Sequence, residues 1–525
     1  MMPFVHLHCH SYYSFFNGTA SPAELVQRAN ELNMPALALT DYCNLHGIPE
    51  FCRSARQYGI KPILGIESVV AGYGLTLLAM NEEGWRNLIQ LSSFAFLNDT
   101  SGMPTIDKEL LRKHHAGLIC LSGFAGGEIG RLLTDDPTSG YENAKTASQW
   151  YQDAFGDRYY LELRNHGIKA QETLFEQTVG IGRELGIETV ATNDIHYLDQ
   201  VDWNIHDILL CIKNVKKVSD EDRPKMGSDQ HFFRNEAEMF TAFSGQDAAV
   251  HRTVEIADRI EPDIFEKFYS KRHHPVFPLP PAKSADELLR ELCVAGFEKR
   301  YTNSLLANKA KQRLESELAV IQKFGQANYF LIIGDIARFA EEQGIYYTAR
   351  GSSPGSLVCH VLGISPVCPL EFGLLFERFF DENRMPDIDI DFDHDRRGEI
   401  IDYVMEKYGK DNIVPLGTIG TFGLKMAIKD IGRAFDKPIP FIDDVVELIP
   451  CVLKPTLGRA LEESAELNHR YKNEPQVKEL LNFANELLLS PRSTGVHPCG
   501  FVIADVPLVD YVPLRKDHHD TVATQ

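Results

Sequence analysis

Three aspartates alternate with apolar residues in the segment 386–392, which reads Pro-Asp-Ile-Asp-Ile-Asp-Phe. Side chains of a β-strand point alternately to its two faces, so Asp387, Asp389 and Asp391 would share one face. Neighbouring carboxylates repel one another unless a cation lies between them, and Mg²⁺ is commonly bound by one or two carboxylates together with substrate phosphates. The pattern therefore predicts phosphoryl transfer with two metal ions ~3.5–4 Å apart. A solvated acidic edge strand is the alternative interpretation.

A turn rich in glycine and serine precedes this segment. Residues 350–356 read RGSSPGS, and the apolar stretch 357–364 that follows is expected to be helical. Small residues before a helix expose backbone N–H groups, and the helix N-terminus adds a partial positive charge. Such a turn is more often just a loop when it occurs alone. Together with the carboxylate strand it predicts a binding site for a triphosphate.

Three segments in series resemble the palm of the bacterial family C DNA polymerases, the alpha subunits of DNA polymerase III. They are RGSSPGSL at 350–357, LLFERFF at 374–380 and MPDIDIDF at 385–392. The resemblance runs along essentially all 525 residues. It implies that Asp387 and Asp389 are the catalytic, Mg²⁺-binding carboxylates. The family gives Asp391 no established catalytic role, and we expect it to support the other two. It also implies a set of residues that bind the incoming nucleotide: Arg350, Gly351, Ser352 and Arg378.

Composition sets limits that agree with a multidomain enzyme. A chain of 525 residues is too long for one core, and its 44% hydrophobic and 24% charged content is ordinary for a globular protein. We expect a cytoplasmic location without membrane contact, because no apolar run reaches ~20 residues, no signal peptide is evident and the ten cysteines form no CxxC pair; the resemblance implies that this cytoplasm is bacterial. The net charge of −21 disfavours a simple DNA-binding module, which should be basic, but not an enzyme with a local basic groove.

The first two hundred residues alternate between predicted strands and helices. The sequence Ser-Pro-Ala-Glu at 21–24 predicts a capping box that opens a helix. This alternation predicts a largely parallel sheet, either a barrel or doubly wound. The predicted strands are 5–10, 36–40, 62–70, 75–80, 117–122, 159–163 and 188–192.

Histidine and acidic residues follow several of these strands. The carboxyl ends of parallel strands meet at one edge of a barrel, where barrel enzymes have their active sites, and such ligands suit zinc, manganese or iron. The segments HLHCHS, LTDYCNLHG, GIE and TNDIHY resemble the polymerase-and-histidinol-phosphatase (PHP) domain, the usual N-terminal domain of these polymerases. The resemblance implies a metal site, with Zn²⁺ or Mn²⁺ as the expected ion, formed by His8, His10, Glu67, His166, Asp194 and His196.

The PHP site departs from the family pattern at several positions. Tyr42 replaces a histidine, Asn17 an acidic residue, Gly74 a histidine and Phe124 a cysteine or histidine. A three-metal cluster would lose several ligands through these changes. We therefore expect one or two metals at most, and a structural role for the barrel in preference to hydrolysis.

The expected architecture is α/β, a PHP-type (β/α) barrel followed by an α+β nucleotidyltransferase-like palm with an inserted helical thumb. The PHP domain is expected at 1–271, with its barrel core at about 1–200 and a helical extension that includes 228–243. The palm is expected at 272–418 and opens with a proline-rich connector at 273–281. The thumb at 419–496 and a returning palm segment at 497–525 follow. In the thumb, Lys425, Lys429 and Arg433 fall on one helix face and would follow DNA phosphates. His497 is expected to contact the template–primer.

The chain stops where the resemblance expects more palm. The third catalytic carboxylate, the fingers and the clamp-binding region of this family would follow residue 525. We expect primer–template DNA and deoxynucleoside triphosphates as partners, and contacts with the missing C-terminal half, a sliding clamp and other replisome subunits through those later regions. The chain alone would then not extend a primer. The replicative or error-prone role stays open, as do two alternatives: a PHP phosphoesterase or exonuclease, and a non-catalytic DNA-binding or assembly fragment.

Overall fold

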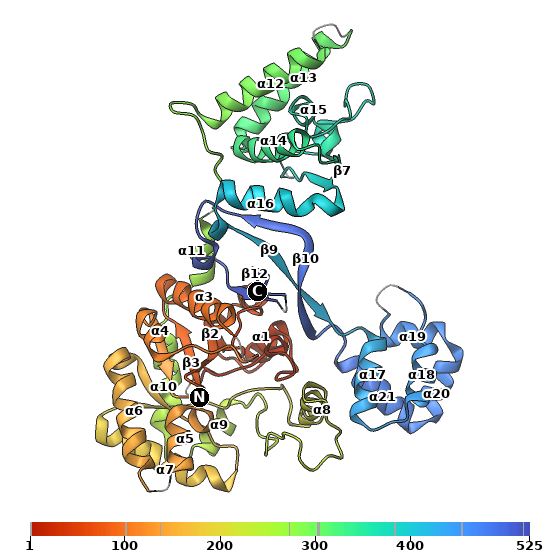
Figure 1. The fold of residues 1–525 in the computed structure, drawn as a ribbon. Coiled ribbons are helices and arrows are strands. Elements are labelled where there is room, and N and C mark those ends of the chain that lie inside the picture. Colours follow the sequence, from red (N-terminus) through yellow and green to blue (C-terminus); the bar gives the residue numbers. More distant parts are fainter. Residues whose placement is uncertain are drawn as a thin grey trace. The chain divides into compact units, whose positions relative to one another are not determined.

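The computed structural model describes residues 3–99, 102–136, 138–271, 273–301, 305–382, 385–452, 455–517 and 519–525 (Figure 1). The chain divides into two compact units. The first unit comprises Met1–Lys271, Pro415–Gly500 and Val509–Gln525, and the second comprises Arg272–Val414 and Phe501–Leu508. No helix within the described ranges is long and apolar enough to cross a membrane.

A six-stranded sheet forms the centre of the first unit. Its strands lie in chain order and match the predicted ones: β1 (Ala36–Leu39), β2 (Lys61–Val70), β3 (Tyr73–Ala79), β4 (Leu118–Leu121), β5 (Tyr159–Leu163) and β6 (Thr189–Ala191). The pairs β1–β2, β4–β5 and β5–β6 are parallel, whereas β2–β3 and β3–β4 are antiparallel. The expectation of a largely parallel sheet therefore needs correction. Ala71 and Gly72 join β2 to β3 with positive φ, as in a tight hairpin, and a parallel crossover needs a dozen residues or more.

The N-terminal segment closes the curled sheet, although it is not the regular strand expected at 5–10. It forms isolated parallel bridges, His6 with Leu37 and Cys9 with Ile195. The backbone N–H of His10 donates to the carbonyl of Ile195 at 2.8 Å. The segment thus lies between β1 and the residues that follow β6, and it carries His8 and His10 to the carboxyl ends of the strands.

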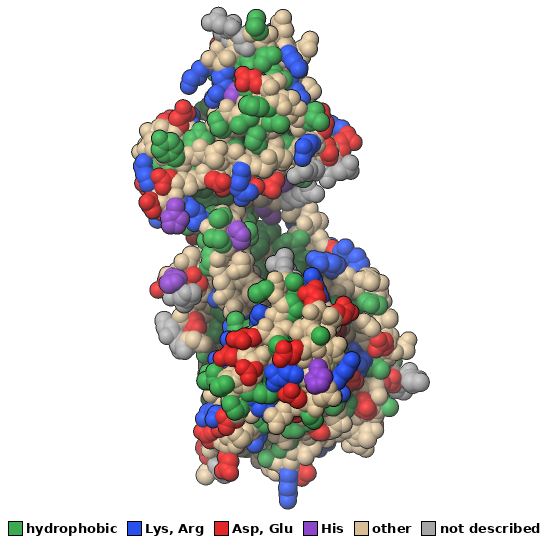
Figure 2. Space-filling view, turned by 90° about the vertical axis from the view of Figure 1, so that its right-hand side faces the viewer, with side chains coloured by type: hydrophobic (Ala, Val, Ile, Leu, Met, Phe, Trp, Pro, Cys, Tyr) green, Lys and Arg blue, Asp and Glu red, His purple; other side chains and the backbone are tan. Residues whose placement is uncertain are grey.

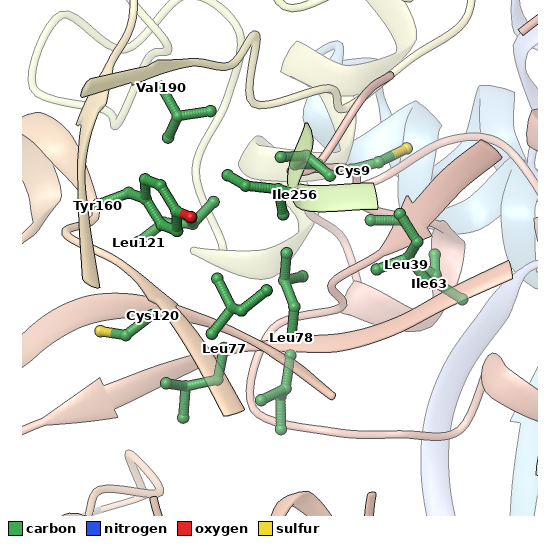
Figure 3. Packing of buried hydrophobic residues seen from close by; sticks show 14 of the residues in the cluster. Cys9, Leu39, Ile63, Leu77, Leu78, Cys120, Leu121, Tyr160, Val190 and Ile256 are labelled. Atoms are coloured by element: carbon green, nitrogen blue, oxygen red, sulfur yellow. The ribbon is translucent and has the colours of Figure 1, made fainter. Parts of the chain in front are cut away.

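Helices cover the outside of this sheet. The first helix, α1 (Pro22–Glu31), begins with the predicted capping box between Ser21 and Glu24. Figure 3 shows apolar side chains from the strands and from α10 gathered in one core, among them Leu39, Leu77 and Ile256, all fully buried. The other helices of this part are α2 (Ile48–Tyr58), α3 (Glu82–Leu97), α4 (Lys108–Lys113), α5 (Glu128–Asp135), α6 (Gly140–Phe155), α7 (Lys169–Leu185), α8 (Trp203–Lys213), α9 (Glu236–Ala242), α10 (Asp247–Asp258) and α11 (Ile264–Ser270).

The expected helical extension at 228–243 is helical only in its second half. Residues 228–235 run without regular structure, and Phe232 forms a parallel bridge with Tyr197. Asn235 then caps α9 together with Glu238. The correction matters because the non-helical part brings His231 to the metal-ligand side chains.

A helical bundle forms another part of the first unit, and two long strands that pair with each other, β9 (Ile413–Thr421) and β10 (Pro491–Ile503), lead to it (Figure 1). The core of the bundle also includes Ile205, Ile208 and Leu209 of α8, so the bundle packs against the barrel part. The helices of the bundle are α17 (Leu424–Ala434), α18 (Ile439–Glu447), α19 (Leu457–Glu463), α20 (Ala465–Asn473) and α21 (Pro475–Glu486). The last segment of this unit contains the short antiparallel pair β11 (Leu514–Lys516) and β12 (Val522–Thr524).

The second unit packs helices around a two-stranded antiparallel sheet. Its strands are β7 (Tyr347–Arg350) and β8 (Asp389–Phe392), in a register that places Arg350 opposite Asp389. A capping box between Ser284 and Glu287 opens its first helix. The helices are α12 (Ala285–Tyr301), α13 (Ala307–Lys323), α14 (Ala327–Glu342), α15 (Leu357–Val361) and α16 (Arg397–Tyr408).

Candidate metal and nucleotide sites

The carboxylates of the palm segment lie on and just before β8. Asp389 and Asp391 share a face, because the guanidinium of Arg350 contacts both: Nη1 lies 3.1 Å from Asp389 Oδ2 and Nε lies 3.0 Å from Asp391 Oδ1. Ile388 and Ile390 pack into the apolar core, as the alternation predicted. Asp387 lies in the segment before the strand, where the next backbone N–H, that of Ile388, donates to the hydroxyl of Tyr329 at 2.9 Å.

These carboxylates are open to solvent. The side chains of Asp389 and Asp391 are 42% and 59% exposed, and that of Arg350 is 58% exposed. Ion pairs at such exposure contribute little, about 0–1 kcal/mol, because water screens them. A cation can therefore compete with Arg350 for both carboxylates at low cost. Arg350 was expected to bind the nucleotide, and here it holds the carboxylate face together.

A cavity of about 460 Å³ lies beside the carboxylates. Gly351 has a φ of +72°, and a Cβ at this position would lie 3.4 Å from Asp389 Oδ2, so glycine suits the turn next to that carboxylate. Three predicted nucleotide-binding residues line the same cavity, whose lining is Gly351, Ser352, Pro354, Gly355, Gly373, Leu374, Leu375 and Arg378.

Arg378 is held at this cavity by the aromatic residues around it. Phe376, Phe379 and Phe380 are buried, which anchors the short segment and leaves the Arg378 side chain exposed. Within the described ranges Arg378 forms no ion pair. Its charge is therefore available to an anion in the cavity.

The N-terminus of α15 does not face this cavity with free N–H groups, so that part of the expectation is wrong. The backbone N–H groups of Leu357 and Val358 both donate to the carboxylate of Glu317 at 3.0 Å, and the hydroxyl of Ser356 donates to it at 2.9 Å. Burial raises the pKa of Glu317, although these N–H groups and Arg313 oppose the shift. Pro354 has no N–H group and the N–H of Gly355 donates to the carbonyl of Ser352, so the donors near a phosphate in the cavity would be the Gly351–Ser352 part of the turn and Arg378.

Arg313 connects Glu317 to two sides of the cavity. Its Nε donates to Glu317 at 2.6 Å, and its Nη2 donates to the carbonyl of Gly355 at 3.1 Å and to that of Leu374 at 3.5 Å. Gly355 and Leu374 both line the cavity. Sequence reasoning missed this pair. Its signal was an arginine and a glutamate at i and i+4 of a helix, which resembles any surface ion pair.

Four side-chain atoms meet at the carboxyl ends of the barrel strands. Asp194 Oδ1 lies 3.6 Å from His8 Nε2 and 3.3 Å from His10 Nε2. Glu67 Oε2 lies 3.9 Å and 3.4 Å from the same two nitrogens. Zinc ligands at about 2.0–2.2 Å from the ion lie roughly 3.3–3.6 Å from one another in a tetrahedron. The atoms of His8, His10 and Asp194 are therefore close enough together to bind one ion, and Glu67 Oε2 lies beside them as a possible fourth ligand.

Both histidines are oriented through their other ring nitrogen. His8 Nδ1 lies 2.9 Å from Glu162 Oε1, and His10 Nδ1 lies 3.0 Å from the hydroxyl of Ser14, which donates to Asp41. The two Nε2 atoms are buried and have no hydrogen-bond partner among the described residues. Metal-binding histidines usually have such outer partners, which fix the tautomer and leave the inner nitrogen for the metal. The residues present fit one bound cation.

Three further histidines lie in or near this cluster. His196 Nε2 lies 3.3 Å from Asp194 Oδ1 and belongs to it. His166 lies outside it, because its Nε2 hydrogen-bonds the carbonyl of Asn193 and its ring stacks on His231. His231 was missed by sequence reasoning; its Nδ1 lies 3.8 Å from Asp194 Oδ2, and it forms a possible ligand group with Asp194 and His196.

The family positions that this chain has changed serve other contacts. The carbonyl of Asn17 accepts a hydrogen bond from His196 Nδ1 and another from His206 Nε2 at 3.2 Å. A Cβ on Gly74 would lie 3.2 Å from Glu67 Oε1. Asn17 therefore orients His196 through its backbone rather than binding a metal through its side chain.

Two charged residues that sequence reasoning missed lie inside this site. Glu162 and Arg164 are buried, and Arg164 Nε donates to Glu162 Oε1 at 3.1 Å. Burial and Arg164 oppose protonation of His8, yet Glu162 and Asp194 outweigh them and raise the pKa of His8 to about 10. Burial lowers the pKa of His10 to about 4. Burial acts against ionisation of Asp194, but Arg164 and the histidines hold its pKa well below the usual range.

The predicted cationic face of the bundle is largely compensated. Lys425, Lys429 and Arg433 lie on α17 as expected, but Lys429 pairs with Asp443 at 3.3 Å and Arg433 pairs with Asp430. Figure 2 shows basic side chains interspersed with acidic ones over the face in view. His497 lies on β10, where its Nδ1 accepts hydrogen bonds from two backbone N–H groups.

Comparison with known proteins agrees with both parts of this description. Residues 6–166 match the family model of the PHP domain, and residues 287–525 match that of the bacterial DNA polymerase III alpha NTPase domain. DNA polymerase III subunit alpha of Borreliella burgdorferi is 38% identical over 542 residues, which cover 99% of this chain and 47% of that protein. The subunits of Treponema pallidum and Escherichia coli are 37% and 35% identical, over 98% of this chain and 45% of each relative.

The fold and the site define a protein that joins a PHP domain to a polymerase-type NTPase domain. The chain is similar over almost its whole length to DNA polymerase III alpha subunits, and its two parts match the PHP and DNA polymerase III alpha NTPase family models. The resemblance drawn from its motifs is thereby confirmed, and so is the expected fold class. The chain spans about half the length of the curated relatives it matches.

Proposed function

We propose that this chain carries the nucleotide-binding part of a DNA-directed DNA polymerase, with deoxynucleoside triphosphates and primer–template DNA as substrates. One observation supports this above all. The cavity beside Asp389 is lined by Gly351, Ser352 and Arg378, so a glycine turn, an exposed cation and a carboxylate face converge. The names of the relatives extend the proposal to a larger replication assembly.

The residues of the second unit have distinct parts in this proposal. Arg378 pairs with the triphosphate, and the Gly351–Ser352 part of the turn donates backbone N–H groups to it. Asp387 and Asp389 would hold Mg²⁺. When bound, Mg²⁺ lowers the pKa of the primer 3′-hydroxyl and stabilises the leaving pyrophosphate. Arg350 keeps Asp389 and Asp391 aligned and yields to the cation, because both ion pairs are exposed.

The first unit has a supporting part. We propose that the barrel binds Zn²⁺ or Mn²⁺ through His8, His10, Glu67 and Asp194, with His196 as a further ligand. The buried Nε2 atoms of His8 and His10, which have no hydrogen-bond partner among the described residues, support a bound cation. The exposed cations of α17, in particular Lys425, contact the DNA backbone.

Calorimetry of dATP with Mg²⁺ tests the nucleotide site. We expect the Asp389→Ala and Arg378→Ala variants to bind dATP at least about tenfold more weakly than the parent, since each loses a charge-assisted contact of about 1.5–3 kcal/mol. Arg396→Ala is the matched control, because Arg396 is an exposed arginine that pairs with Glu399 away from the cavity. Equal affinity in all four proteins would refute the assignment.

A further inference from the structure

The side chain of Arg164 lies inside the barrel site, and each of its three guanidinium nitrogens contacts a residue of that site. Nη1 donates to Asp194 Oδ2, Nε donates to Glu162 Oε1 at 3.1 Å, and Nη2 lies 3.4 Å from Glu162 Oε2 and 3.0 Å from His8 Nδ1. The side chain is 9% exposed, whereas that of Glu162 is fully buried. A guanidinium so engaged has no nitrogen left for a substrate phosphate.

The two oxygens of Asp194 face different partners. Its Oδ1 lies within 3.6 Å of the Nε2 atoms of His8, His10 and His196, where a cation fits. Its Oδ2 contacts Arg164 instead. In a two-metal site a carboxylate commonly bridges two ions through its two oxygens. Here the guanidinium has the place that a second ion would take.

The charge balance of the cluster agrees with a single divalent ion. The carboxylates within 4 Å of the ring nitrogens of His8 and His10 are Glu67, Glu162 and Asp194. With Arg164 as the cation, these three carboxylates leave two negative charges once a metal at Nε2 displaces the proton of His8 and both histidines are neutral. Unpaired buried charge is costly, so a cluster of this kind is stable when one M²⁺ neutralises it. A second or third divalent ion would leave an excess of positive charge.

We infer that this site binds one divalent cation, between His8, His10, Glu67 and Asp194, and that Arg164 is a permanent internal cation in place of a second metal. The inference concerns the chain's own residues and does not rest on polymerase activity. It predicts the number of bound ions and the effect of removing the guanidinium. Manganese is the suitable probe, because nitrogen and carboxylate ligands both bind it and it is paramagnetic.

The experiment first removes metal from the protein with a chelator, then adds Mn²⁺ and desalts the protein. Elemental analysis and electron paramagnetic resonance then count the Mn²⁺ ions bound per chain. It uses the full chain with Asp387→Asn and Asp389→Asn, so that ions in the palm do not contribute. We expect one magnetically isolated Mn²⁺ per chain. In Arg164→Ala, Asp194 Oδ2 and Glu162 become free ligands, and we expect two ions with spin coupling between them. Arg164→Lys, the matched control, keeps a cation and should keep one.

Thermal unfolding gives a second readout. Without metal, Arg164→Ala should unfold at a lower temperature than Arg164→Lys, because two buried carboxylates lose their partner, and Mn²⁺ should restore most of the difference. Two or more ions in the parent would overturn the inference, and so would a single ion in a folded Arg164→Ala protein. No bound ion in the parent would overturn it as well, while the dATP measurement on the unmodified palm would be unaffected.

Discussion

Replacing Glu317 should destabilise the second unit much more than replacing an exposed glutamate that also forms an ion pair. The carboxylate of Glu317 is fully buried and accepts hydrogen bonds from the N–H groups of Leu357 and Val358, from the hydroxyl of Ser356 and from Arg313. Glu317→Gln keeps the shape of the side chain but replaces one accepting oxygen with a donating NH₂ group. At least one backbone N–H of α15 then meets a donor, and Arg313 loses its negative partner.

The size of the effect follows from these contacts. A buried backbone N–H left without an acceptor costs about 1–3 kcal/mol, and breaking a buried ion pair costs about 3–5 kcal/mol. The two costs overlap, so we expect Glu317→Gln to lower the local unfolding free energy of the second unit by about 3–5 kcal/mol. Glu315→Gln is the matched control on the same helix. Glu315 pairs with Arg290 at 2.6 Å but is 52% exposed, so its loss should cost about 0–1 kcal/mol.

Hydrogen exchange of peptides from α13 and α15 measures this difference where it arises. Tryptophan fluorescence would not, since Trp85, Trp150 and Trp203 all lie in the first unit. A loss of 3 kcal/mol corresponds to exchange that is roughly a hundredfold faster. Unchanged tryptophan fluorescence serves as the control for the rest of the fold. Similar protection of α15 in Glu317→Gln and Glu315→Gln would refute the reasoning, as would undiminished dATP binding in Glu317→Gln.

Two further predictions concern the first unit. His6 is fully buried, and burial lowers its pKa from 6.5 to about 3. The unfolded chain therefore binds one more proton between these values, and stability falls as pH falls below 6.5, by about 1.4 kcal/mol per pH unit from this group. In His6→Phe the unfolding free energy should fall less steeply between pH 6 and 5, and the difference in slope should correspond to about one proton. Urea unfolding followed by tryptophan fluorescence measures both slopes, and equal slopes in the two proteins would contradict the burial argument. On α17, Lys425 has no ion pair among the described residues, whereas Lys429 pairs with Asp443. Lys425→Ala should reduce the salt dependence of duplex DNA binding, measured by fluorescence anisotropy, by about 0.9 in log–log slope, and Lys429→Ala by less than half of that. The reverse order would exclude the proposed phosphate contact.

The palm site was predictable where its residues lie on short local segments. Gly351, Ser352 and Asp389 belong to a turn and a strand whose conformations follow from glycine and from strict alternation. The role of Glu317 was not predictable, because it acts on residues some forty positions further along the chain through the packing of α13 against α15. A glutamate four residues after an arginine in a helix gives no sign of such burial.

The barrel site shows the same limit in a different form. His8, His10, Asp194 and His196 were predicted to converge because strand ends meet at one edge of a sheet, and they do. Glu162 had a signal, since it is the one charged residue in the strand YYLEL, all five of whose residues are buried. A charge in such a strand must have a buried partner. The partner could not be named from the pattern, because Arg164 lies after the strand and turns back to it.

The two sites contain the same pairing, one arginine against two carboxylates, and burial decides what each pairing can do. Arg350 contacts Asp389 and Asp391 at the surface, where water screens the pairs and their separation costs about 0–1 kcal/mol. Arg164 contacts Glu162 and Asp194 in the interior, where separation costs about 3–5 kcal/mol. A metal that arrives with a nucleotide can therefore replace Arg350, but not Arg164. The palm pairing is thus suited to exchange with substrate, and the barrel pairing is suited to a fixed charge.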